Sequence, residues 1–223
     1  MIPLQFALRR RMMMAGGGGG APISDLPLGA LINVGTDGGE GAPNYEIADK
    51  DNLMDGGVVL VRKEIYSKSM FGSTEGYPNN TLDKLITNTI YGRLPQKLKD
   101  KMIDVTFNLA GIGDITRKMF ALSCTMAGFG KNLGIVEGKA LQLYKSDARR
   151  IKKFKGVADL WWLSSRRLNS DNDEWSVWAV YARGYKGDPS NGDPQGVVFA
   201  FVIPSKTLYD PTLNTDGSYN LIL

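Results

Sequence analysis

Residues 196–205 read GVVFAFVIPS. Seven apolar residues, four of them β-branched, lie in succession between a glycine and a proline. A short apolar run of this composition, bounded by turn residues, is typical of a strand that is buried on both faces. We therefore predict a strand over residues 197–203. It should end at Pro204, because proline cannot donate to the hydrogen-bond ladder of a sheet.

Further strands are predicted on the N-terminal side of this run. Two are rich in tryptophan, residues 159–165 and 175–183, and residues 103–107 alternate between apolar and polar side chains as a half-buried strand does. Other candidates lie at residues 28–34, 45–48, 58–61 and 118–123. With 27 glycines, many in turn-like clusters, this pattern favours many short strands over a helix bundle.

Two short helices are also predicted. Residues 79–90 place leucines and isoleucines on one face, with Asn80 or Thr81 as the N-cap, Asp83 in the first turn and Gly92 at the end. Asn79–Thr81 also matches a glycosylation sequon, but capping is the favoured interpretation. Pro95 opens a second helix to about Lys101. Residues 140–144 and 147–155 are compatible with helix or irregular structure.

These elements predict an α+β, β-rich single domain over residues 22–223, preceded by an arm and glycine hinge over residues 1–21. The arm either docks on a partner, adding a strand or filling a groove, or is a disordered tail. Its docking residues would be Ile2, Leu4, Phe6, Leu8, Arg9, Arg10 and Arg11.

Composition limits the chemistry that the chain can perform. It has no histidine and one cysteine, Cys124, so histidine-based catalysis, internal disulfides and cysteine-rich zinc sites are excluded. Cys124 follows an apolar strand and is predicted to be a buried structural thiol. A net charge of +4 does not by itself indicate nucleic acid, and no apolar stretch is long enough to span a bilayer. We therefore expect no enzyme and no cofactor.

Three local patterns are candidates for binding. The run NSDNDE at residues 169–174 is rich in the oxygen ligands that calcium prefers, but it lacks the pattern of a calcium-binding helix-loop-helix site, and a solvated turn is the favoured interpretation. Six basic residues at positions 145–155 form either a solvated face, a subunit contact or an anion site. Of the four tryptophans at residues 161–178, those facing outward could stack on a sugar or pack on a partner.

Three blocks of sequence resemble an uncharacterised domain family found in phage tail or fibre proteins and in Firmicutes surface proteins. The blocks are residues 81–103, residues 150–165 with Trp161-Trp162-Leu163-Ser164-Ser165, and residues 196–205 with Asp216-Gly217 after them. Residues 118–123 extend the resemblance to about residues 27–220. Ser165 and Val198-Phe199 depart from the family pattern, which puts local packing in doubt. The resemblance implies a C-type-lectin-like fold, while the single cysteine excludes the activity of formylglycine-generating relatives.

In lectin-like folds the long loops near the late strands form the binding face, here residues 166–174 and 184–195. The candidate ligand-binding residues are therefore Arg166, Asn169, Asp171, Asn172, Asp173, Trp178, Tyr185, Asp188, Asn191 and Asp193. The resemblance implies a bacteriophage virion protein, assembled in the host cytoplasm. Its arm would dock on other virion proteins and its head would bind a host surface glycan or protein.

Two alternatives stay open: a purely architectural decoration or connector subunit, and a polysaccharide hydrolase that uses Asp171 or Asp173. A homo-oligomer is expected because virion appendages are symmetric, and a trimer is taken as its form.

Overall fold

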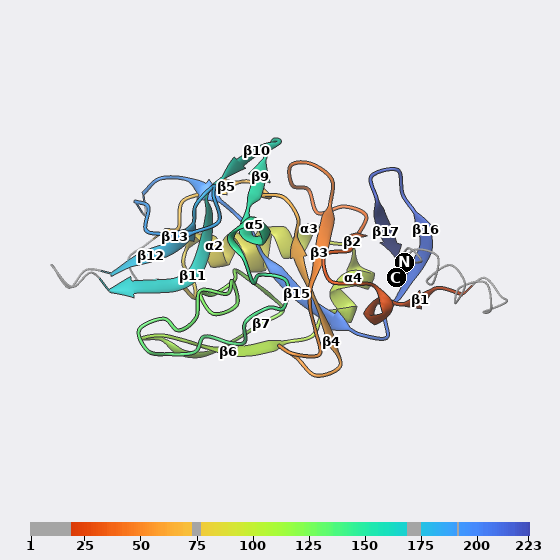
Figure 1. Ribbon diagram of the computed structural model, residues 1–223, viewed down its shortest axis with the longest axis horizontal. Coiled ribbons are helices and arrows are strands. Elements are labelled where there is room, and N and C mark those ends of the chain that lie inside the picture. Colours follow the sequence, from red (N-terminus) through yellow and green to blue (C-terminus); the bar gives the residue numbers. More distant parts are fainter. Residues whose placement is uncertain (1–18, 73–76, 169–174, 191) are drawn as a thin grey trace.

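A computed structural model describes residues 19–72, 77–168, 175–190 and 192–223 of the 223-residue chain. The molecule is elongated and mostly β-sheet, with a few short helices between the sheets (Figure 1). The predicted α+β class is confirmed at this level. The arm residues predicted at positions 2–11 lie outside the described residues.

An eight-stranded sheet forms one end and the centre of the molecule, in the order β1-β16-β17-β2-β3-β4-β15-β8. Its strands are β1 (Ala21–Pro22), β2 (Leu31–Asn33), β3 (Asn44–Lys50), β4 (Gly57–Arg62), β8 (Met119–Phe120), β15 (Ala200–Pro204), β16 (Leu208–Leu213) and β17 (Ser218–Leu221). The 3₁₀ turn η1 (Ile23–Asp25) follows β1. All pairings are antiparallel except that of β17 with β2, which is parallel.

The apolar run at residues 197–203 supplies strand β15 at the centre of this sheet. Its register pairs Phe201 with Leu60 and Val202 with Val59, and all four side chains are buried. Both faces of β4 and β15 are covered, which explains why neither strand alternates between apolar and polar residues. Pro204 ends β15 as predicted, but residues 197–199 precede the strand, which begins at Ala200.

A five-stranded sheet lies at the other end, in the order β13-β12-β11-β14-β5 (Figure 1). Its strands are β5 (Lys68–Ser69), β11 (Trp161–Leu168), β12 (Trp175–Val180), β13 (Lys186–Gly187) and β14 (Gln195–Gly196). Trp161 and Trp162 are fully buried, and their indole N–H groups donate to the carbonyls of Arg150 at 3.0 Å and Ser69 at 2.7 Å. They are core residues, so neither is available to a ligand.

The predicted helices are confirmed with shifted ends. Asn80 caps α2 (Thr81–Lys84) by accepting from the Asp83 N–H at 2.8 Å. The helix continues through the π-helical turns of η2 (Leu85–Ile90) and α3 (Tyr91–Arg93), past the predicted end at Gly92. Pro95 precedes α4 (Gln96–Lys101) as predicted.

Three predicted elements are corrected. The strand predicted over residues 103–107 begins two residues later, as β6 (Val105–Leu109), and it pairs with β7 (Gly113–Arg117) in a separate hairpin. Of the strand predicted over residues 118–123, only Met119–Phe120 forms a strand. Residues 147–155 form α5 (Asp147–Arg150) and β9 (Lys152–Phe154), which pairs with β10 (Val157–Asp159). Lys155 and Gly156 have φ of 50° and 83°, the values that a tight two-residue hairpin turn requires.

The basic cluster at residues 145–155 is therefore only partly a solvated face. Lys152 is fully buried, and its ammonium contacts the Glu46 carboxylate at 2.5 Å and the Arg62 carbonyl at 3.0 Å. Burial lowers the pKa of Lys152. Although burial acts to raise the pKa of Glu46, the charges of Lys152 and Lys63 outweigh it and hold that pKa below its usual range. The pair joins hairpin β9–β10 to strand β3 of the large sheet.

Candidate functional site

Strand β12 carries Trp178, which lies between two cations. Lys186 pairs with Val180, and side chains two residues apart on a strand share a face, so Lys186 lies diagonally across from Trp178. Its ammonium sits 4.0 Å from the indole centroid, and the Arg167 guanidinium lies 5.3 Å from it. Arg167 also forms an ion pair with Asp188. The ring face of Trp178 is thus engaged by cations, as its quadrupole favours.

Beyond β12 the chain turns sharply and stacks two tyrosines. The rings of Tyr181 and Tyr185 are 5.0 Å apart and almost parallel, at 9°. The turn is closed by hydrogen bonds from the Gly184 N–H to the Tyr181 carbonyl at 2.7 Å and from the Tyr181 N–H to the Tyr185 carbonyl at 2.9 Å. A Cβ on Gly187 would lie 1.8 Å from the Tyr181 ring, so this glycine allows the ring to lie flat on the strand. Tyr185 remains 48% exposed.

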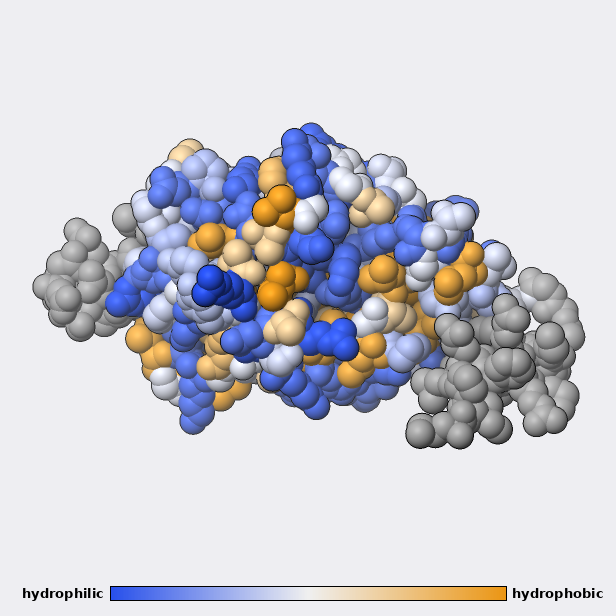
Figure 2. Space-filling model, turned by 45° about the horizontal axis from the view of Figure 1, so that its top comes forward, coloured by the Kyte–Doolittle hydropathy of each residue, from blue (hydrophilic) through white to orange (hydrophobic). Residues whose placement is uncertain are grey.

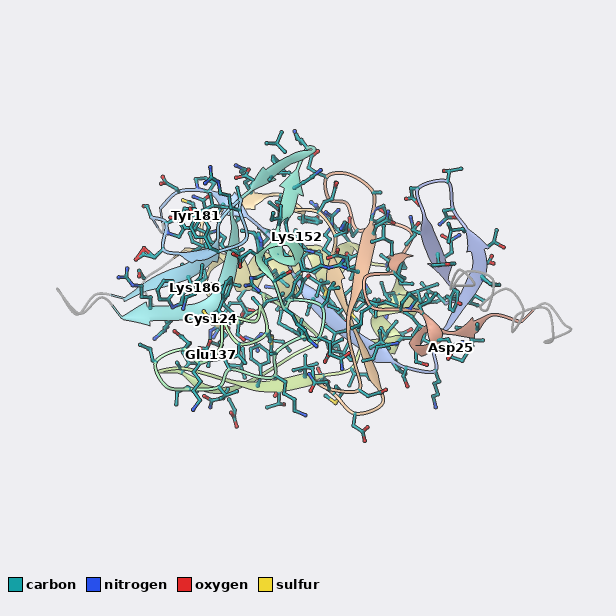
Figure 3. All side chains as sticks on the ribbon, viewed as in Figure 1. Asp25, Cys124, Glu137, Lys152, Tyr181 and Lys186 are labelled. Atoms are coloured by element: carbon teal, nitrogen blue, oxygen red, sulfur yellow. The ribbon has the colours of Figure 1, made fainter. Side chains whose placement is uncertain are left out.

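We call the group Arg167, Trp178, Tyr181, Tyr185, Lys186 and Asp188 the aromatic site. Figure 3 shows Tyr181 and Lys186 in the same part of the molecule as Cys124 and Glu137. The arrangement offers the exposed ring of Tyr185, whose orientation is fixed by stacking, and two cations beside the ring of Trp178. Such a surface suits stacking on a flat apolar face and hydrogen bonding to its polar edge.

A buried polar network fixes the aromatic site from beneath. The Trp178 indole N–H donates to the Asn132 side-chain carbonyl at 3.0 Å. The Asn132 amide in turn donates to Glu137 at 2.9 Å and to the Arg166 carbonyl at 2.8 Å. Glu137 is fully buried and also accepts from the Ala110 N–H at 3.0 Å and from the Ser165 hydroxyl. Among the described residues it forms no ion pair, so hydrogen bonds alone satisfy this carboxyl group.

Cys124 lies against the same network. Its backbone N–H donates to the Ser165 hydroxyl at 2.6 Å, and its side chain is fully buried. Burial raises the pKa of the Cys124 thiol to about 12. The predicted structural thiol is confirmed, and Cys124 is protonated at neutral pH.

We expect Cys124 to be inert toward a disulfide reagent such as Ellman's reagent in the native protein, because the thiolate is the reactive species. The absorbance of the released thiolate should show no reaction at neutral pH, and one thiol per chain after denaturation. Rapid native labelling, at a rate near that of a free thiol, would show that Cys124 is accessible.

The structure brings together part of the predicted ligand-binding set. Trp178, Tyr185 and Asp188 belong to the aromatic site, Arg166 lies on β11 beside Asn132, and Asp193 is exposed in the following loop. Asn169, Asp171, Asn172, Asp173 and Asn191 lie outside the described residues, as does the proposed calcium-binding run.

Sequence reasoning missed Arg167, Tyr181, Lys186, Asn132 and Glu137. The spacing of Tyr181 and Tyr185 around Gly184 could have indicated a turn with stacked rings. Nothing in the sequence indicates Glu137, because the partners of its side chain come from three separate segments. Across the described ranges, no group of three acidic, cysteine or histidine side chains could hold a metal ion. No helix in these ranges has the length and hydropathy to cross a bilayer.

Searches of curated proteins and of solved structures gave no significant match. A family model described as a domain of unknown function, DUF6273, matches residues 56–205. This range is more than half of the 223 residues and includes strands β4 to β15, with the whole aromatic site. The chain therefore belongs to the DUF6273 family.

Proposed function

We propose that the protein is a non-enzymatic adhesion module whose head binds a surface saccharide through the aromatic site. The observation that carries this proposal is the Tyr185 ring, half exposed and held parallel to Tyr181. Tyrosine provides a large amphipathic contact at a low cost in conformational entropy, and here that cost is reduced further by the stacked partner. The cations at Trp178 supply donors for hydroxyl or acidic groups of the ligand.

The arrangement of the head supports attachment at one end and binding at the other. The described chain begins just before β1, which pairs with β16, and it ends just after β17, which pairs with the same strand. Both ends of the head therefore lie at the opposite end of the long axis from β12 and β13 (Figure 1). We infer a lectin-like head on a phage virion, whose N-terminal arm docks on the particle, and this inference rests on the family resemblance.

The test is the binding of wild-type protein and Tyr185 variants to a glycan array, followed by host adsorption. Tyr185→Ala should weaken binding by roughly 30-fold, because loss of a hot-spot side chain costs about 2 kcal/mol or more. Tyr185→Phe keeps the ring and should retain most of the affinity.

Val157→Ala is the matched control, since Val157 is 70% exposed at the tip of a different hairpin. Equal binding by Tyr185→Ala and wild type would refute the role of the aromatic site.

A second candidate function is purely architectural. It is favoured by three exposed aliphatic residues, Leu133, Ile135 and Val136, which a receptor-binding role does not explain. Unchanged adsorption together with a fragile particle, after substitution of these residues, would favour the architectural role. The carboxylates of the hydrolase alternative, Asp171 and Asp173, lie outside the described residues.

A further inference from the structure

One loop presents aliphatic side chains to solvent from a rigid support. We call residues 131–139 the aliphatic loop. Leu133, Ile135 and Val136 are 50%, 41% and 51% exposed. Asn132 and Ile135 exchange backbone hydrogen bonds of 2.9 and 2.8 Å, and the buried Glu137 fixes the end of the turn. The loop therefore holds its apolar side chains in place while they face water.

The residue at the tip of this loop is unfavourable for its backbone. Leu133 has a φ of 49° and Gly134 a φ of 79°, a turn in which asparagine followed by glycine is preferred. A non-glycine residue at positive φ carries a conformational cost, and leucine lacks the local hydrogen bonding that offsets it for asparagine. Leucine at this position is consistent with a contact made by its side chain.

The exposed charges of the aliphatic loop have one sign. Lys131 and Lys139 are exposed, whereas its one acidic residue, Glu137, is buried. The Lys139 ammonium donates to the neutral Asn52 carbonyl at 2.7 Å, and within the described ranges it forms no ion pair. The solvent-facing part of the loop is thus apolar and positive.

The hairpin β16–β17 has the complementary character. Leu208, Leu213 and Ile222 are 39%, 53% and 43% exposed. Residues 207–223 contain two acidic residues, Asp210 and Asp216, and no lysine or arginine. Hydrogen bonds from Ser218 and Asn44 lower the pKa of Asp216 to about 2, and one from Thr212 lowers that of Asp210. This hairpin is apolar and negative at neutral pH.

The two surfaces lie at opposite ends of the molecule. The aliphatic loop is bonded to β11, β12 and the turn after β6, at the end of the long axis opposite β16 and β17 (Figure 1). Apolar residues occur in small groups toward both ends of the face seen in Figure 2. A single copy therefore cannot bring the aliphatic loop onto its own hairpin, whereas two copies in head-to-tail order can.

We propose that the aliphatic loop of one copy docks on the β16–β17 hairpin of a second copy. The contact pairs aliphatic side chains and places Lys131 and Lys139 opposite Asp210 and Asp216. It is heterologous, so it closes into a ring or continues as a chain according to the rotation between copies. The inference does not depend on what the aromatic site binds.

Charge reversal tests this contact, with full-length protein in sedimentation velocity over a series of concentrations. Wild type should associate, and association should weaken from about 0.1 M to about 1 M salt, where the Debye length falls from about 10 to about 3 Å. Lys131→Glu/Lys139→Glu should remain monomeric, as should Asp210→Lys/Thr215→Lys, because each places like charges together. Asp216 is left in place because it holds Asn44 and Ser218.

An equimolar mixture of the two charge-reversed proteins should associate again, since each reversed surface now meets an opposite charge. Failure of the mixture to associate, with both variants folded by circular dichroism, would overturn the proposal. A wild-type protein that stays monomeric would also overturn the proposal. The same holds if association is lost on deleting residues 2–15 but is unaffected by charge reversal.

A last variant separates docking from folding. Leu133→Asn suits the turn better than leucine, so the monomer should melt at the same or a higher temperature. Its association constant should nevertheless fall by at least about tenfold, as expected when a buried apolar contact is lost. An association constant equal to that of wild type would contradict the proposed contact.

Discussion

Lys152→Met is expected to lower the free energy of unfolding by about 3–5 kcal/mol, the usual cost of removing one partner of a buried ion pair. Lys152 is fully buried, and its ammonium is bonded to Glu46 at 2.5 Å and to the Arg62 carbonyl at 3.0 Å. Methionine fills similar space but leaves the Glu46 carboxylate with Lys63 as its remaining cation. Urea denaturation followed by tryptophan fluorescence measures the loss.

Lys153→Met is the matched control, because Lys153 is exposed on the same strand. Its free energy of unfolding should stay within about 0.5 kcal/mol of wild type. Adding Glu46→Leu to Lys152→Met should recover part of the loss, since the buried carboxylate that has lost its buried partner is then removed. Equal stability of the Lys152→Met and Lys153→Met proteins would show that the Lys152–Glu46 pair does not hold β9 to β3.

Glu137→Leu is expected to have a comparable effect and to loosen the aromatic site as well. The substitution removes the acceptor of three buried donor groups: the Ala110 N–H, one N–H of the Asn132 amide and the Ser165 hydroxyl. Each unsatisfied buried donor costs about 1–3 kcal/mol, so a total loss of at least about 3 kcal/mol is expected in urea denaturation. Because Asn132 also holds the Trp178 indole, saccharide binding should weaken too.

Glu137→Gln is the conservative comparison. It keeps one side-chain oxygen as an acceptor but adds two donors, so it should be intermediate in stability. Hydrogen exchange at the Ala110 amide is the local readout, since this N–H donates directly to Glu137. If the Ala110 amide of Glu137→Leu is as protected as in wild type, and the variant is equally stable, the Glu137 carboxyl group does not hold the buried network together.

Local features of the fold could be predicted from the sequence because short-range chemistry determines them. The apolar run before Pro204, the Asn80 cap and the buried Cys124 each follow from neighbouring residues. The hairpin at Lys155-Gly156 could not be predicted in the same way. The surrounding lysines suggested a solvated segment, and only the tertiary partner Glu46 makes burial of Lys152 favourable.

The candidate site was predictable to a similar extent. Trp178, Tyr185 and Asp188 were identified from their position in late loops and strands. The buried network that supports these residues could not be identified in the same way. The partners of Glu137 come from residues 110, 132 and 165, and a sequence does not indicate which distant segments meet. Lys186 becomes a partner of Trp178 only through the pairing of β12 with β13.

The most direct test of the binding proposal is a titration with the saccharide that the array identifies, followed by NMR of the indole N–H and tyrosine ring signals. The protein has four tryptophans, and the Trp161 and Trp162 indoles are bonded inside the core. The account predicts saturable shifts of the Trp178 indole and the Tyr185 ring, with the Trp161 and Trp162 signals unchanged. Saturable binding that leaves the signals of Trp178 and Tyr185 unmoved would contradict it.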